Sequence, residues 1–207
     1  MSTPQPGLSP TRRRTRDALV SAARDLLARG ITPTVEEAAV AANVSRTTAY
    51  RYFPSKTTLL AAAHPEVAAA SLLDPEPPAD ATSRLEVVID RFVDLILGSE
   101  PQQRATLRLS LSGTDESQES LPLRQGRAIP WILEALEPLR DRFGEPELHR
   151  LALAIRSATG IEALIWLRDV GGLSADEAGD VMRWSARAML QAALKSGPPA
   201  VNDKVGR

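Results

Sequence analysis

The chain has 207 residues, a formal net charge of −1 at neutral pH, no cysteine and two histidines. This length allows one large domain or two unequal ones, and the composition excludes disulfides, thiolate metal ligands and cysteine nucleophiles. No apolar run reaches the roughly 18 residues of a membrane span, so we expect a cytoplasmic protein without membrane contacts.

The charge is unevenly distributed along the chain. Residues 1–64 hold nine Lys and Arg residues against four Asp and Glu residues, a net charge of +5. Residues 65–207 hold sixteen against twenty-two, a net charge of −6. This asymmetry predicts a basic module that meets a polyanion and an acidic module with a different task.

The N-terminal part predicts a tail followed by helices. Residues 1–9 are rich in Pro, Gly and Ser, the composition of a disordered tail. A helix is expected over residues 10–29, where apolar side chains recur at helical spacing until Gly30 stops the pattern. A second helix is expected over residues 34–43, because Thr34 and the glutamate three positions later have the spacing of a capping box.

A third and a fourth helix follow after short breaks. Ser45 caps the third helix, which Pro54 closes, and Ser55 caps the fourth, which ends before Pro65. Only the interval Ala42–Ser45 separates the second helix from the third. A short turn between two short helices, the second of them rich in hydroxyl groups, indicates a helix-turn-helix unit.

The rest of the chain predicts more helices and no strand. Residues 72–83 are a proline-rich break, and apolar side chains then recur at helical spacing in five stretches: about 85–96, 101–112, 122–142, 147–170 and 174–192. The stretch at 147–170 is apolar on two faces, which predicts burial on both sides. Much of the last stripe is small, which permits close approach of a neighbouring helix. The expected fold is all-α with about nine helices.

The third helix carries the residues suited to DNA. In a helix-turn-helix the N-terminal residues of the recognition helix face base edges. Arg46 and Thr47 hold these positions, and Arg51 lies about one turn further on; the arginine fork matches the two acceptors of guanine, and threonine can bond any base. Other donors nearby suit phosphate oxygens: Thr48, Tyr50, Tyr52 and Lys56. The alternative is a solvated basic helix in which the tyrosines merely pack, and the complete ordered unit favours DNA binding.

Residues 34–60, TVEEAAVAANVSRTTAYRYFPSKTTLL, resemble the DNA-binding domain of the TetR family of bacterial transcriptional regulators. The resemblance places base reading at Arg46, Thr47 and Arg51. It places phosphate contacts at five positions: Thr34, Thr48, Tyr50, Tyr52 and Lys56.

The chain departs from the family pattern at three places. Asn43 replaces a common glycine at the turn and can adopt the same backbone conformation. Ala49 replaces a larger apolar residue in the recognition helix. Glu36 and Glu37 bring negative charge near the DNA, so we do not expect the second helix to read sequence.

The resemblance also implies a domain organisation and a function. It implies a helix-turn-helix domain over residues 10–64 and a ligand-binding and dimerisation domain over 65–207, with about the last ten residues disordered. The implied function is a repressor that a small-molecule effector releases from a palindromic operator in double-stranded DNA. The alternative is a DNA-binding adaptor of the same fold whose C-terminal domain binds a protein partner. An enzyme, a cofactor or a metal site is not expected, because no nucleophile–base pair, paired carboxylates or phosphate loop stands out.

In this family the last two helices of each chain build the four-helix bundle of a homodimer. The interface is therefore expected at eight residues: Leu153, Ile161, Leu164, Val181, Trp184, Ser185, Ala188 and Ala192. An internal effector pocket would be lined by the middle helices. Its expected lining is Phe92, Trp131, Ile132 and Trp166, and ordinary core packing is the alternative for each of them.

Overall fold

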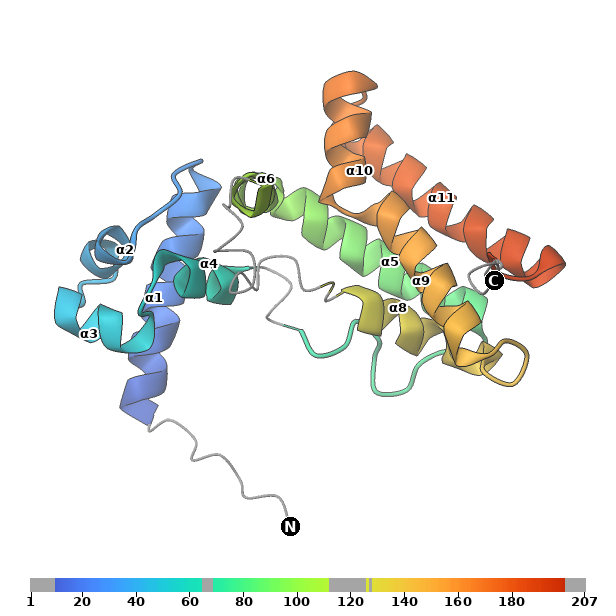
Figure 1. Cartoon of the computed structure of the whole chain (residues 1–207), viewed down its shortest axis with the longest axis horizontal. Helices are drawn as coiled ribbons and strands as arrows, with labels where there is room; N and C mark the ends of the chain where they lie inside the picture. Colours follow the sequence, from blue (N-terminus) through green and yellow to red (C-terminus); the bar gives the residue numbers. More distant parts are fainter. Residues whose placement is uncertain (1–9, 65–68, 112–125, 127, 200–207) are drawn as a thin grey trace, which may run out of the picture. The chain divides into compact units, whose positions relative to one another are not determined.

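The computed structural model describes residues 10–64, 69–111, 126 and 128–199. These residues form helices and no strand, which confirms the all-α fold class, and they hold nine helices when α9 and α10 are counted as two parts of one. The expected N-terminal tail, residues 112–125 and the end of the chain from residue 200 lie outside the described residues. The described helices fall into two compact units (Figure 1).

The first unit holds the four N-terminal helices and α6. Its elements are α1 (Pro10–Ala28), α2 (Val35–Ala41), α3 (Arg46–Tyr52), α4 (Lys56–Ala63) and α6 (Glu100–Leu111). Helix α1 packs against α2, α3 and α4. Their shared core includes Leu19, Leu27, Leu59 and Phe53, together with Ala105 of α6. The sequence prediction placed α6 with the C-terminal helices, and this packing groups it with the N-terminal ones instead.

Local side-chain bonds set the helix boundaries of the helix-turn-helix, as predicted. The Thr34 hydroxyl accepts a bond of 3.2 Å from the Glu37 backbone N–H, and the Glu37 carboxylate accepts one of 2.7 Å from the Thr34 N–H. The Ser45 hydroxyl accepts from the Thr48 N–H at 3.3 Å and starts α3. Asn43 has a φ of 54° and lets the chain turn between the two helices, as expected for a residue that stands in for glycine.

The second unit is built on four helices that share one core. Its elements are α5 (Ala81–Gly98), α8 (Ala128–Leu136), a 3₁₀ turn (Glu137–Leu139), α9 (Glu145–Thr159), α10 (Ile161–Ile165), a π turn (Trp166–Val170) and α11 (Ala175–Ser196). Helix α11 packs against α5 and α9, and α8 packs against the same two helices (Figure 1).

The stretch that the sequence predicted as one helix over 147–170 is broken at Gly160. This residue has an extended backbone, with φ −93° and ψ −178°, and separates α9 from α10. A Cβ atom at Gly160 would lie 1.5 Å from Nη1 of Arg156, which pairs with Glu162 at 3.2 Å. The glycine therefore leaves room for an arginine that bridges the break.

The helix predicted over 122–142 ends early, at Leu136. Pro138 follows in the 3₁₀ turn, and a proline has no N–H to continue the α-helical bonding. The part of this prediction before Ala128 falls almost wholly outside the described residues.

Helix α11 is a long helix whose inner face is lined by small residues. Ser174 and Glu177 form the predicted capping box at its start. Gly179 is buried, and a Cβ there would lie 3.0 Å from Leu97 and 3.5 Å from Val93 of α5. The absence of a side chain lets the two helices approach closely. Among the described residues, no helix is both long and apolar enough to cross a membrane.

We expect Ser174→Ala to lower the free energy of unfolding by about 1 kcal/mol, because the first N–H groups of α11 lose their acceptor. Urea denaturation should show a lower midpoint at an unchanged slope. Ser196→Ala is the matched control: this serine is exposed in the last turn of the same helix, where free carbonyls rather than N–H groups need partners. Equal effects of the two variants would contradict the capping role.

Candidate functional site

The three residues predicted to read bases lie together on the exposed face of α3. Arg46 is the first residue of the helix, and 74% of its side chain is exposed. Thr47 and Arg51 are exposed as well, and a spacing of four residues makes them neighbours on the helix surface. The opposite face of α3 is anchored in the core by Ala49, which is fully buried. The helix thus presents two guanidinium groups and a hydroxyl to the outside.

The residues predicted to contact phosphate surround this face. Thr48 is half-buried at α3 and accepts a bond of 2.8 Å from the Ser45 hydroxyl, so its own hydroxyl proton is available to an acceptor outside. Tyr52 is half-buried and packs against the core with its ring. Lys56 is the first residue of α4 and is half-buried. Its positive charge helps to lower the pKa of Glu37, after the larger effect of the bonds from Thr34.

Two of the predicted phosphate donors are already bonded to acidic residues of α2. The Thr34 hydroxyl donates to Oε2 of Glu37 at 2.9 Å, within the capping box. The Tyr50 hydroxyl donates to Oε1 of Glu36 at 2.7 Å. A phosphate that takes either proton must displace a carboxylate first. These two donors are therefore less available than the sequence prediction assumed.

Glu36 also pairs with Arg46, which the sequence did not predict. Oε1 of Glu36 lies 3.0 Å from Nη2 of Arg46, and the guanidinium carbon lies 5.7 Å from the centre of the Tyr50 ring. The spacing of Arg46 and Tyr50, four residues apart on one helix, is a signal that the two side chains meet. No comparable signal exists for Glu36, which lies across the turn on another helix.

Three of the four residues expected to line an internal pocket are buried, and the fourth is exposed. Phe92, Trp131 and Ile132 are buried, with the rings of Phe92 and Trp131 edge to face and their centroids 6.1 Å apart. Trp166 is 61% exposed in the π turn after α10 and so lines no internal pocket. Its predicted inward position assumed one continuous helix over 147–170, and the break at Gly160 turns it outward.

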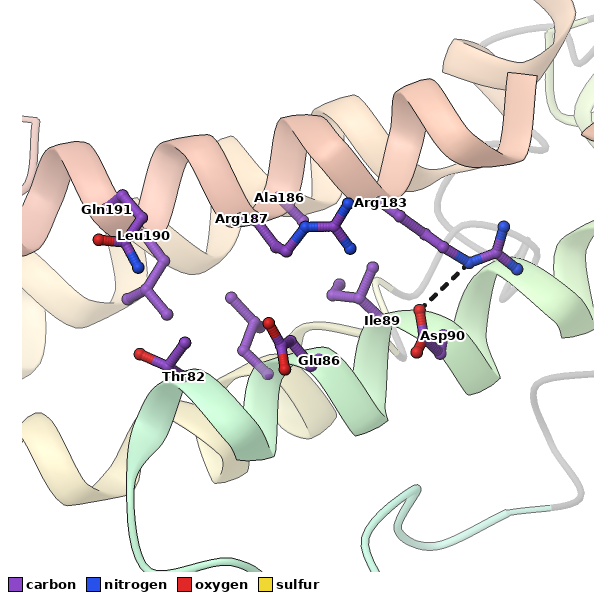
Figure 2. Close-up of a pocket in the computed structure, with 10 residues that line it drawn as sticks. Thr82, Glu86, Ile89, Asp90, Arg183, Ala186, Arg187, Leu190 and Gln191 are labelled. Atoms are coloured by element: carbon purple, nitrogen blue, oxygen red, sulfur yellow. Dashed lines mark ion pairs between the residues drawn. The ribbon is translucent and has the colours of Figure 1, made fainter. Parts of the chain in front are cut away.

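A small cavity lies between α5 and α11 and has a volume of about 130 Å³. Figure 2 shows Ile89 and Leu190 between the two helices, with Glu86 and Asp90 on α5 and Arg183 and Arg187 on α11. Arg183 pairs with Asp90 at 3.1 Å and ties the helices together. Pockets for drug-sized ligands span about 300–1,000 Å³, so this cavity is too small for one.

A larger groove lies on the same unit, where the 3₁₀ turn meets the start of α9. Its volume is about 710 Å³, within the range of small-molecule sites. It combines apolar side chains with charged ones: Leu133, Leu148, Arg84, Arg140, Glu134 and His149. Arg140 is held by Glu137 at 2.9 Å, so one of the groove's positive charges is fixed in place.

The residues predicted for the dimer interface divide into an exposed set and a buried pair. Leu153, Val181 and Trp184 are large apolar residues with exposed side chains, and Trp184 is 64% exposed. Ala192 is exposed as well, and Ser185 and Ala188 are half-buried. Ile161 and Leu164 are instead buried in the core of their own unit, which corrects the prediction at these two positions. The break at Gly160 changes the rotation of α10 relative to α9, so a face extrapolated from Leu153 does not continue through it.

Comparison with known proteins identifies the class of this helix-turn-helix. Residues 19–63 match the sequence model of the tetR family of bacterial regulatory proteins. The chain shares its fold with a TetR transcriptional regulator from Rhodococcus sp. RHA1, with 22% identity over 87% of this chain and 98% of that one and a TM-score of 0.57. It also shares its fold with a tetR-family transcriptional regulator from Streptomyces coelicolor, with 23% identity over 92% and 85% and a TM-score of 0.63. No curated protein matches the sequence. The N-terminal helices thus match the tetR family over residues 19–63, and the predicted resemblance is confirmed.

We expect the two tryptophans of the predicted pocket to differ sharply in their effect on stability. Trp131 is 3% exposed and donates its indole N–H to the Ala70 carbonyl at 3.1 Å, so Trp131→Ala should cost about 3–5 kcal/mol. Trp166→Ala removes an exposed side chain and should cost about 1 kcal/mol or less. Urea denaturation of both variants at one protein concentration measures the difference. Equal losses would show that Trp166 is packed as tightly as Trp131.

Proposed function

We propose that the protein is a dimeric, sequence-specific DNA-binding regulator of transcription without catalytic activity, acting in the cytoplasm. The observation that carries the proposal is the exposed face of α3, where Arg46, Thr47 and Arg51 project from a helix whose other side is buried. An exposed arginine fork is the side chain best suited to the two acceptors of guanine in the major groove. The net charge of +5 over residues 1–64 supports the attraction of this part of the chain to DNA.

Phosphate contacts complete the proposed interface. Thr48 keeps a hydroxyl proton free for an acceptor, and Tyr52 at the end of α3 and Lys56 at the start of α4 are half-buried donors. Thr34 joins them when DNA displaces the Glu37 carboxylate to which it donates, whereas Tyr50 keeps its bond to Glu36. Such contacts fix the register of the protein on the duplex and carry no sequence information themselves.

The exposed apolar face of α9 and α11 supports a homodimer. Large exposed apolar groups on a folded chain mark interaction surfaces, and Leu153, Val181 and Trp184 form such a set together with Ala188 and Ala192. A second copy of the chain offers the same apolar residues in a two-fold arrangement. A two-fold dimer presents two identical recognition helices, so the operator is a near-palindrome.

The groove of about 710 Å³ supports a small-molecule effector and a repressor that it releases from DNA. The groove belongs to the unit that also carries the proposed dimer face, so a ligand bound there can change the geometry of the dimer and the spacing of its recognition helices. Its lining sets two arginines and a histidine against three glutamates, with leucines and prolines beside them, and so suits a small ligand with both polar and apolar parts. These features favour an effector over the adaptor alternative, in which a protein partner takes its place.

Replacing Arg46 and replacing Lys56 should weaken DNA binding in different ways. If Arg46 reads a base pair, Arg46→Ala costs about 1–3 kcal/mol per half-site and relaxes the preference at one base position. If Lys56 contacts phosphate, Lys56→Ala weakens binding about equally on all sequences and lowers the salt slope by about 1 per contact. The measurement selects an operator from a random duplex pool and then tests both variants on its single-base changes at two salt concentrations.

Arg46 also carries charge, so the base preference and not the salt dependence is the deciding result for this residue. If the Arg46→Ala protein keeps the wild-type order of base preferences, Arg46 contacts the DNA backbone and does not read a base. Wild-type binding by both variants would contradict the proposed DNA interface as a whole.

We expect Trp184→Glu to convert the dimer into a monomer with unchanged helix content, because association would bury a charge without a partner. Ala188→Glu, one helical turn further along α11, should do the same. Sedimentation velocity measures the oligomeric state and circular dichroism the helix content. Val40→Glu is the control, since this exposed valine lies on α2 of the first unit and is not one of the proposed interface residues. A dimer that survives both substitutions on α11 would place the interface elsewhere.

A further inference from the structure

Glu36, Arg46 and Tyr50 form a closed cluster on the DNA-facing side of the first unit. One carboxylate oxygen of Glu36, Oε1, lies 2.7 Å from the Tyr50 hydroxyl and 3.0 Å from Nη2 of Arg46. The guanidinium of Arg46 also lies over the Tyr50 ring, 5.7 Å from its centre. Each member therefore contacts the other two, and two helices, α2 and α3, contribute to the cluster.

The charge states needed for these contacts hold at neutral pH. The bond from Tyr50 lowers the pKa of Glu36, with a smaller contribution from the Arg46 charge, so Glu36 stays ionised. The same bond raises the pKa of Tyr50, which keeps its proton. A phenol has a single proton to donate, and here Glu36 holds it.

The cluster restricts Arg46, an exposed cation of the recognition helix. A free arginine side chain has many rotamers and can turn its donors to a phosphate as readily as to a base. Glu36 occupies Nη2 of Arg46, and the Tyr50 ring lies 5.7 Å from the guanidinium carbon, so these two neighbours restrict the direction in which the remaining donors can point. A donor group that is oriented before binding loses less freedom when it meets its acceptors, so orientation favours the partner whose geometry fits.

The Glu36 carboxylate also repels DNA phosphate, which competes with a base edge for Arg46. Glu36 is 37% exposed and carries a full negative charge beside the guanidinium. It repels a phosphate that approaches the same nitrogen, whereas the acceptors of guanine are neutral. Discrimination between partners often depends on such a repulsive group as well as on the attractive one.

We propose that Glu36 determines the specificity of this DNA interface by orienting Arg46 toward a base edge and opposing its contact with phosphate. This inference rests on the proposed function, in which Arg46 reads a base pair. Glu36 is a positioning residue in this scheme: it acts through Arg46 and Tyr50 and reads no base itself.

The test compares Glu36→Gln with Glu37→Gln in the full chain. Both changes remove one negative charge from the first turn of α2. Glu37 bonds to Thr34 in the capping box, and glutamine can serve in that motif too, so Glu37→Gln removes the charge and keeps the cap. The probes are the duplex selected from a random pool, its single-base changes, and a scrambled duplex of equal length.

We expect both variants to bind the scrambled duplex more tightly than the wild type, because each loses a charge that repels phosphate. Only Glu36→Gln should also lose discrimination at the base pair that Arg46→Ala identifies. The expected loss is about two- to fivefold per half-site, the effect of breaking one exposed ion pair. In an Arg46→Ala background, Glu36→Gln should change nothing further at that base pair. Thermal melts confirm that both variants are folded.

Three results would overturn the inference. Glu36→Gln could keep the wild-type discrimination, the two glutamine variants could alter the base profile equally, or Glu36→Gln could still change that base pair without Arg46. A different failure, in which Arg46→Ala leaves every base preference unchanged, would refute the base-reading role on which the inference rests. The two kinds of failure are therefore distinguishable in one set of titrations.

Discussion

The burial of one side of α3 is the constraint on which the exposed basic face of this helix depends. A helix of seven residues is not stable by itself in water, because nucleating the first turn costs more than its few hydrogen bonds return. Helix α3 is held by the Ser45 cap at its start and by Ala49 and Phe53, which are buried in the N-terminal core. Once these two side chains point inward, the rotation of the helix is fixed, and Arg46 and Arg51 have to face outward.

In both units, small residues are buried where helices contact each other, as Ala49 is in α3. Ala23, Ala38 and Ala49 are fully buried in the first unit, and Gly179 and Ala186 are buried in α11 of the second. The distance between two packed helices depends on the side chains at their contact, so small side chains bring the backbones close. Because only the face with small side chains allows this close contact, each helix has one rotation about its axis relative to its neighbours. In α11 this specificity separates an inner face of small residues from an outer face that carries Trp184.

The two glutamates of α2 stabilise the fold, and in the proposed interface their negative charge opposes the binding of DNA. Negative charge in the first turn of a helix is favourable because the free N–H groups there carry partial positive charge. Glu37 completes the capping box, and Glu36 pairs with Arg46 of the recognition helix. In the proposed interface the same two carboxylates repel phosphate and hold the hydroxyl protons of Thr34 and Tyr50. Under the proposal for Glu36, the basic module loses part of its non-specific attraction to DNA and gains a defined geometry of its donors.

The sequence by itself determined the local features of this protein. The starts of α2, α3 and α11, the positive φ of Asn43 and the exposed face of α3 all followed from residue types and their spacing. Capping bonds and helical periodicity act over three or four residues, and so the sequence states them directly. The helix predicted from the apolar spacing over 174–192 was also correct, although this spacing did not show which of its side chains would be buried within the unit.

Only the tertiary structure decided the contacts between segments. The pair of Glu36 and Arg46 joins residues ten positions apart across a turn, and the grouping of α6 with the N-terminal helices depends on packing far along the chain. The extended backbone at Gly160 also changes which later residues lie inside the unit. Trp166 is exposed and Leu164 is buried, opposite to what one continuous helix over 147–170 predicts. A periodic pattern gives the spacing of side chains within one helix and not its rotation against neighbours. That rotation is fixed by the packing of all the helices in a unit together.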